Sequence, residues 1–198
     1  MSTANKTEIG HEVAESQIRE RRIESLDDIV REIAERRLVS ELHDSVPAER
    51  VEAMRQRPDL IEQQAEFERE AWKAGIRDTS GVLGWSTNLE SPAHVLKNDA
   101  STEIATLIHE DAHRLTHPET LREMSATPDR KALYEGMTEL LTQRAANGLH
   151  EYVPGHCYPD EVRRAGALAD EVGEQRLRDY FFKHEMADEV RRAIERAE

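Results

Sequence analysis

Long hydrophobic runs are missing from this chain of 198 residues. No segment has the roughly 18 consecutive apolar residues that a membrane-spanning helix needs, and residues 1–8 contain no apolar signal region. Hydrophobic residues make up 37% of the sequence and charged residues 34%, a composition typical of a strongly solvated protein. We therefore expect neither membrane insertion nor classical secretion.

Cysteine is nearly absent, because Cys157 stands alone. A single cysteine cannot form a disulfide within the chain, which agrees with a reducing compartment, so we expect a cytoplasmic protein. We interpret Cys157 as a small loop residue. The alternative is a nucleophile beside His156, although the sequence supplies no third group that would orient such a pair.

Excess positive charge is also absent, since 27 Lys and Arg residues face 41 Asp and Glu residues and the net charge is -14. A nucleic-acid backbone repels a chain of this charge, so we expect no nucleic-acid partner. The arginines of residues 19–22 and 31–37 are interleaved with glutamates at helical spacing, as on a solvated helix face. A neutral or basic peptide or protein substrate fits this charge better.

The most informative feature that is present is a His-Glu-x-x-His motif at residues 109–113. Residues four apart lie on one face of a helix, so His109 and His113 can bind one zinc ion while Glu110 projects beside its open coordination position. Zinc lowers the pKa of its bound water, and Glu110 can take the proton and return it to a leaving amine. The motif therefore predicts a hydrolase.

The sequence around the motif favours the helix that this chemistry needs. Residues 101–115 carry apolar side chains at helical spacing, after a capping hydroxyl at Ser101 or Thr102. The segment ends before Pro118, because proline disfavours helical geometry in the residue before it. We predict an amphipathic helix of about four turns.

A catalytic zinc ion usually has three protein ligands and a fourth position for water, so a third ligand is needed. A second helical pattern covers residues 133–146 and places Glu135 and Glu139 on one face. Two interpretations are open: these carboxylates belong to the zinc site, or they are two solvated side chains of an acidic protein. His117 is the rival ligand, but it reaches the metal only if the first helix continues to the following proline.

The two segments together resemble the gluzincins, the thermolysin-like and aminopeptidase-like metallopeptidases in which a glutamate ligand on a second helix follows the His-Glu-x-x-His helix. Residues 134–139, Tyr-Glu-Gly-Met-Thr-Glu, are similar to the Asn-Glu-Gly-Phe-Thr-Glu type of element in that clan, and 21 residues separate His113 from Glu135. The resemblance implies that Glu135 is the third ligand and that Glu139 accepts a hydrogen bond from a ligand histidine. It covers roughly residues 81–185, and its specific part is confined to the two motifs.

The segment before the zinc helix, residues 81–99, predicts two short strands joined by turns. In gluzincin-like domains, a strand at this position pairs along its free edge with an extended peptide substrate. The resemblance makes residues 93–97 the candidate for this edge, and an ordinary hairpin over the core is the alternative. We interpret Trp85 and His94 as packing residues.

Many gluzincins also carry a tyrosine or histidine after the third ligand, which donates a hydrogen bond to the developing oxyanion. Tyr158 or His156 can supply this group, and we choose Tyr158, which stands where a loop meets a helix beginning at Pro159. A structural role for Tyr158, with a packed ring and a hydroxyl bonded to the backbone, is the alternative.

Asp111 departs from the gluzincin pattern, because many relatives have an apolar residue at this position. A carboxylate here predicts that this side of the helix is wetter or that it contacts a basic partner. The extra carboxylate also leaves two alternatives open: a different set of metal ligands, or a metal-dependent reaction other than peptide hydrolysis.

The N-terminal third of the chain contains no catalytic pattern. Residues 8–75 are almost wholly helical in pattern, with Ser25 able to cap a helix through Asp28 and further breaks at Pro47, Pro58 and Gly75. Three roles are open for this region: it packs on the zinc core, it covers the cleft of that core, or it binds a partner. The sequence does not distinguish among them.

We predict a predominantly helical α+β fold with a small antiparallel sheet. It comprises an N-terminal helical region over residues 1–78 and a zincin-like metallohydrolase domain over residues 79–198. The expected function is a cytoplasmic zinc-dependent peptidase or amide hydrolase. Two other hypotheses stay open, a regulatory metal-binding protein without turnover and a helical interaction protein in which the motif is coincidental. The substrate and the oligomeric state are not indicated.

Overall fold

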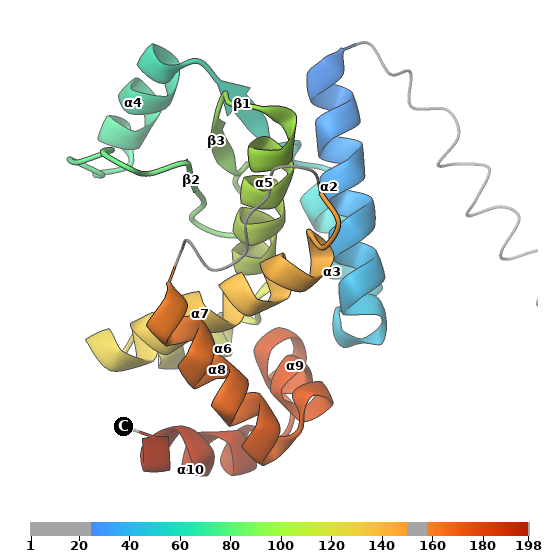
Figure 1. The fold of residues 1–198 in the computed structure, drawn as a ribbon, viewed down its shortest axis with the longest axis vertical. Helices are drawn as coiled ribbons and strands as arrows, with labels where there is room; N and C mark the ends of the chain where they lie inside the picture. Colours follow the sequence, from blue (N-terminus) through green and yellow to red (C-terminus); the bar gives the residue numbers. More distant parts are fainter. Residues whose placement is uncertain (1–24, 150–157, 198) are drawn as a thin grey trace, which may run out of the picture.

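The computed structural model describes residues 25–149 and 158–197, which are mostly helical with one small sheet (Figure 1). The helical elements are α2 (Leu26–Leu42), the 3-10 turn η1 (His43–Ser45), α3 (Ala48–Arg55), α4 (Gln64–Lys73), α5 (Ala100–Leu115), α6 (Pro118–Met124), α7 (Pro128–Ala145), α8 (Pro159–Val172), α9 (Glu174–Lys183) and α10 (Ala187–Ala197). The strands are β1 (Leu60–Glu62), β2 (Gly84–Trp85) and β3 (His94–Leu96). The prediction of a mainly helical fold is confirmed. Within these ranges no helix combines the length and the apolar composition that crossing a bilayer requires.

The sheet is mixed, so the prediction of an antiparallel sheet is wrong. Its strand order is β1-β3-β2, with β1 parallel and β2 antiparallel to β3. The added strand, Leu60–Glu62, lies in the segment whose pattern predicted helix. Only five residues separate Pro58 from α4, too few for a further helix of ordinary length, and they pair with β3 through backbone hydrogen bonds instead.

The central position of β3 also overturns the expectation of a free edge at residues 93–97. Leu60 N donates to Ala93 O at 2.8 Å on one side of β3, and Leu96 N donates to Leu83 O at 2.8 Å on the other. Both edges of β3 are therefore occupied. In the part of the chain that the structure describes, β2 is an edge strand whose outer side has no strand partner.

The sheet packs against α4 and α5 (Figure 1). Trp85 and His94 are directly opposite each other in the β2–β3 register, and their rings stack with centroids 3.9 Å apart and planes 6° apart. His94 Nδ1 lies 2.8 Å from Glu62 Oε2 on the neighbouring strand. The interpretation of Trp85 and His94 as packing residues is confirmed.

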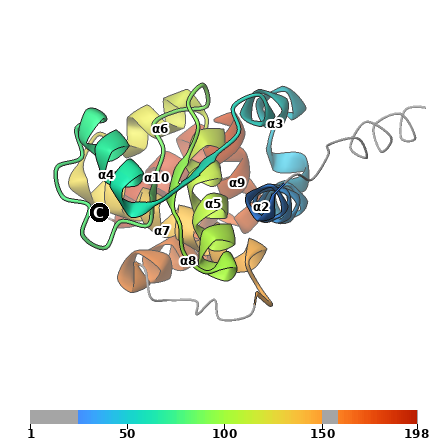
Figure 2. The same ribbon diagram turned by 90° about the horizontal axis from the view of Figure 1, so that it is seen from above.

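Helix α5 is the centre of the structure and packs against α2, α3, α7 and the sheet. Figure 2 shows it with α2 and α3 on one side and α4 on the other. One hydrophobic core cluster contains Val30 and Leu38 of α2 together with Leu107 and Ile108 of α5. The residues on either side of position 78 thus share a core, and the domain boundary at that position stays a prediction.

Helix α2 begins as its sequence predicts. The Ser25 hydroxyl accepts a hydrogen bond from Asp28 N at 3.2 Å, and the Asp28 carboxylate accepts one from Ser25 N at 3.0 Å. This reciprocal pair satisfies backbone groups that have no partner inside the helix.

Asp111 lies in a buried ion-pair network on α5. It is 2% exposed, and its Oδ1 accepts from Arg114 Nη1 at 2.7 Å. The same guanidinium binds Asp59 and donates to Arg57 O at 3.0 Å. The expectation of a wet helix side is therefore wrong, and the expected basic partner is Arg114, one turn later on the same helix.

Two carboxylates share one guanidinium in this network, away from water. Burial raises the pKa of Asp59 and of Asp111, and the nearby Asp59 carboxyl raises the pKa of Asp111 further. Because the network links α5 to the segment that precedes β1, it fixes the helix that carries the motif relative to the sheet.

The Asp111→Asn substitution tests this network. With a raised pKa in the folded state, the Asp111 carboxyl makes folding less favourable as the pH rises from about 4 through that pKa, and asparagine does not titrate. The free energy of unfolding of the variant, minus that of wild type, should grow by about 1 kcal/mol or more from pH 4 to pH 8. Urea titrations at both pH values measure it, with the exposed Asp129→Asn as control, and a difference that stays constant or shrinks contradicts the prediction.

Candidate metal centre

Helix α5 presents both histidines of the motif from one face, as predicted. It runs from Ala100 to Leu115, but its N-cap is Asp99, whose carboxylate accepts from Thr102 N at 3.0 Å, in place of Ser101 or Thr102. His117 lies beyond the helix end. Its Nδ1 accepts from Glu119 N at 3.2 Å to cap α6, so its proposed role as rival third ligand is wrong.

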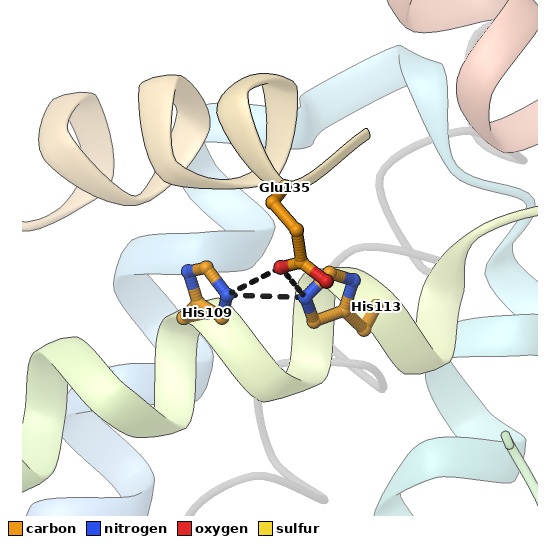
Figure 3. Close-up of side chains that lie close together, drawn as sticks. All are labelled: His109, His113 and Glu135. Atoms are coloured by element: carbon orange, nitrogen blue, oxygen red, sulfur yellow. Dashed lines mark hydrogen bonds and ion pairs between the residues drawn. The ribbon is translucent and has the colours of Figure 1, made fainter. Parts of the chain in front are cut away.

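The side chains of His109, His113 and Glu135 converge in the space between α5 and α7 (Figure 3). His113 Nε2 lies 3.0 Å from His109 Nε2 and 3.1 Å from Glu135 Oε2, and His109 Nε2 lies 3.5 Å from the same oxygen. Zinc–ligand distances of about 2.0–2.1 Å in a tetrahedral site place ligand atoms about 3.3–3.4 Å apart. The observed triangle therefore has the dimensions of one face of such a site.

Residues of α7 hold the far side of each imidazole. His109 Nδ1 lies 3.3 Å from Glu139 Oε2, and His113 Nδ1 lies 3.4 Å from the Thr138 hydroxyl. This hydroxyl donates to Tyr134 O at 3.0 Å, so it is free to accept from His113. With both Nδ1 atoms protonated, both Nε2 lone pairs face Glu135 and are free for a metal ion.

Thr138 is a site residue that was not predicted from the sequence. It lies inside the segment compared with the gluzincins, but a threonine within a helix most often bonds to the preceding turn, as Thr138 also does to Tyr134. Only the crossing of α5 and α7 shows that its oxygen faces a ligand histidine. Its position three residues after Glu135, on the same helix face, was the available signal.

The charges at the point of convergence favour a cation. Burial opposes protonation of His109, but hydrogen bonds with Glu135 and Glu139 outweigh it and raise the pKa of His109 to about 10. Burial alone would raise the pKa of Glu135, whereas its contacts with His109 and His113 hold that pKa well below its usual value. A metal ion can replace the proton that these groups otherwise share.

Glu110, which follows His109 in the sequence, is held against the sheet. It is 7% exposed, and its Oε2 accepts from the Ser86 hydroxyl at 2.9 Å. Gly84 of β2 packs against the same side chain, since a Cβ at this glycine would lie 3.0 Å from Glu110 Cγ. The structure thus places the Glu110 side chain against β2 and the residue that follows it.

Tyr158 approaches the site from the start of α8. Its ring lies 6.2 Å from that of His109, with planes 14° apart, and its backbone is left-handed with φ of 53°. Close packing at Gly136 accounts for the approach of α8 to α7, because a Cβ there would lie 2.2 Å from Glu161 O. His156 and Cys157 lie outside the described residues.

The three ligand residues are the one group of metal-binding type found among residues 25–149 and 158–197, and they can hold a metal ion. Two imidazoles and one carboxylate form a donor set that suits zinc and neighbouring transition metals. Comparison of the chain with protein-family models, curated proteins and solved structures gives no match. The site is therefore interpreted from its own geometry.

The Thr138→Val substitution tests the hydrogen bond behind His113. It keeps the side-chain shape but removes the acceptor, so zinc affinity should fall about 10- to 100-fold. Competition with a chromophoric chelator measures the affinity. The control is Thr142→Val, because the Thr142 hydroxyl donates to Thr138 O one turn along the same helix without contacting a histidine. Equal losses of zinc affinity in the two variants would show that the Thr138 hydroxyl stabilises α7 and does not orient His113.

Proposed function

We propose that this protein is a zinc-dependent metallopeptidase with a zincin-like site of the gluzincin type. The observation that carries the proposal is the convergence of His109, His113 and Glu135 within 4.8 Å of one another, with Glu110 next to His109 in the sequence. Gluzincins combine these residue types on two successive helices. The lone Cys157 of the sequence supports a cytoplasmic location.

Each residue of the site has its own role in the proposed peptide hydrolysis. A zinc ion held by His109, His113 and Glu135 would lower the pKa of a water molecule and polarise the substrate carbonyl. Glu110 accepts the proton of that water as it attacks the carbonyl carbon, and then delivers the proton to the nitrogen of the leaving amine. Glu139 and Thr138 keep the two imidazoles oriented through both steps.

The outer edge of β2 is the candidate binding edge for the substrate, in place of residues 93–97. Leu83 O accepts from Leu96 N, so the backbone groups of Leu83, and of Trp85 two residues later, point toward β3. The N–H and C=O groups of Gly84 then point outward. An extended peptide can pair with them directly above Glu110.

A hollow of about 420 Å³ at the start of β2 supports a basic substrate. Carboxylates of Glu68 and Asp78 line it. The one arginine in its lining, Arg77, lies with its guanidinium over the Trp72 ring, 4.0 Å from the ring centroid. A lysine or arginine side chain of the substrate is the group that best complements this lining and the net charge of -14.

The Glu110→Gln substitution tests the proposed reaction. Glutamine cannot take a proton, so the variant should bind one zinc ion per chain and cleave at least about 100-fold more slowly than wild type. Metal analysis and mass spectrometry of a digested peptide library measure both, with cleavage favoured in peptides that contain Lys or Arg. The control is Glu119→Gln, an exposed position on α6.

The outcomes separate the proposal from its two alternatives. Zinc-loaded wild type that cleaves no peptide favours a regulatory metal-binding protein. A wild-type chain that neither purifies with zinc nor takes it up favours a helical interaction protein with a coincidental motif. Cleavage by Glu110→Gln at the wild-type rate would refute the role of Glu110.

Tyr158 is proposed as the donor to the developing oxyanion. Tyr158→Phe should lower kcat about 100-fold or more, while KM and zinc content stay near wild type, because the hydrogen bond strengthens only as charge develops. Steady-state kinetics on the best library peptide test this. Tyr180→Phe is the control, since the Tyr180 hydroxyl donates to Glu123. A Tyr158→Phe variant with unchanged kcat would assign the ring a structural role.

A further inference from the structure

We propose that Ser86 is a positioning residue, which holds the carboxylate of Glu110 in the orientation that proton transfer requires. The inference rests on the proposed function, because it assigns a role to Ser86 only if Glu110 acts on a water molecule at the metal centre. Ser86 lies outside both motifs and immediately follows β2.

Within the described residues, the Ser86 hydroxyl makes its hydrogen-bond contacts with Glu110. Its Oγ lies 2.9 Å from Glu110 Oε2 and 3.2 Å from the main-chain oxygen of the same residue. The single hydroxyl proton goes to the nearer acceptor, which is also the charged one. The side chain and the backbone of Glu110 are therefore tied to one point on the sheet.

The two carboxylate oxygens of Glu110 have different surroundings. Oε2 is bonded to Ser86, whereas no hydrogen bond to Oε1 occurs among the residues that the structure describes. Ser86 thus leaves one oxygen in place to receive a proton from water.

Gly84 also restricts the side chain of Glu110. A Cβ at Gly84 would lie 3.1 Å from Glu110 Oε1 and 2.5 Å from Thr106 Cγ2, so the strand approaches α5 as closely as a residue without a side chain allows. Gly84 and Ser86 are two apart and face α5 together. The glycine limits where the glutamate chain can lie, and the serine sets the rotation of its carboxylate.

A glutamate side chain has three rotatable bonds, and its catalytic efficiency depends on how often the correct rotamer is occupied. Because the Ser86 bond selects one rotamer, its loss lowers the occupancy of the reactive geometry without changing the ligands of the metal. The expected signature is a lower kcat at constant zinc affinity and nearly constant KM.

The test compares Ser86→Ala, Ser86→Cys and Ser86→Thr with wild type as zinc-loaded full-length protein. Alanine and cysteine should lower kcat about 10- to 100-fold, and threonine, which keeps the hydroxyl, should recover most of it. Ser91→Ala is the control, because no hydrogen bond of the Ser91 hydroxyl occurs with the described residues. Thermal unfolding identifies variants that fail to fold, and the cysteine variant replaces alanine if only alanine fails.

A second readout needs no peptide substrate. The O–H group of acetohydroxamic acid can donate to a carboxylate beside the metal to which it binds, so calorimetry on zinc-loaded protein reports the placement of Glu110. Ser86→Ala should raise the dissociation constant about tenfold in the wild-type background and leave it unchanged in the Glu110→Gln background. This coupling is not expected from a merely structural serine.

The possible failures are distinguishable. If wild type cleaves, Glu110→Gln does not, and Ser86→Ala matches wild type in both kcat and hydroxamate affinity, the role of Ser86 is refuted and the peptidase stands. An equal loss of hydroxamate affinity in both backgrounds also refutes it. If zinc-loaded wild type neither cleaves peptides nor binds the hydroxamate, the proposed function fails and the inference fails with it.

Discussion

The candidate metal centre depends on hydrogen bonds that orient two imidazoles across the crossing of α5 and α7. Glu139 and Thr138 hold the Nδ1 atoms of His109 and His113, and only then do both Nε2 lone pairs meet the Glu135 carboxylate. Without these bonds either ring can turn or change tautomer, and the triangle of ligand atoms is lost. The second helix therefore supplies the third ligand and also the orientation of the first two.

The five residues of the motif point in four directions around helix α5. The histidines face α7, Glu110 faces β2 and Ser86, and Asp111 with Arg114 binds the segment before β1. Ala112, which is fully buried, faces the hydrophobic core. The Asp111 carboxylate completes a buried network with Arg114 and Asp59 and lies outside the candidate ligand set.

Some features of the site were available from the sequence and others were not. The spacing of His109 and His113 predicted a shared helix face, and resemblance to the gluzincins pointed to Glu135 and Glu139. Ser86 gave no signal, because a serine after a short strand has no pattern that points to a residue 24 positions later. Strand β1 was missed for a related reason, since Leu60 and Ile61 fit a helical stripe equally well.

The sequence by itself determined the predominantly helical fold, the pair of histidines with their glutamate, and the acidic character of the chain, because helical periodicity and capping act between residues a few positions apart. The tertiary structure alone decided that β3 is central and β2 is the edge, that Asp111 is buried with Arg114, and that Thr138 and Ser86 face the site. These outcomes depend on how segments distant in sequence pack together. A short strand can pair with many other strands, so its own sequence does not specify its partner.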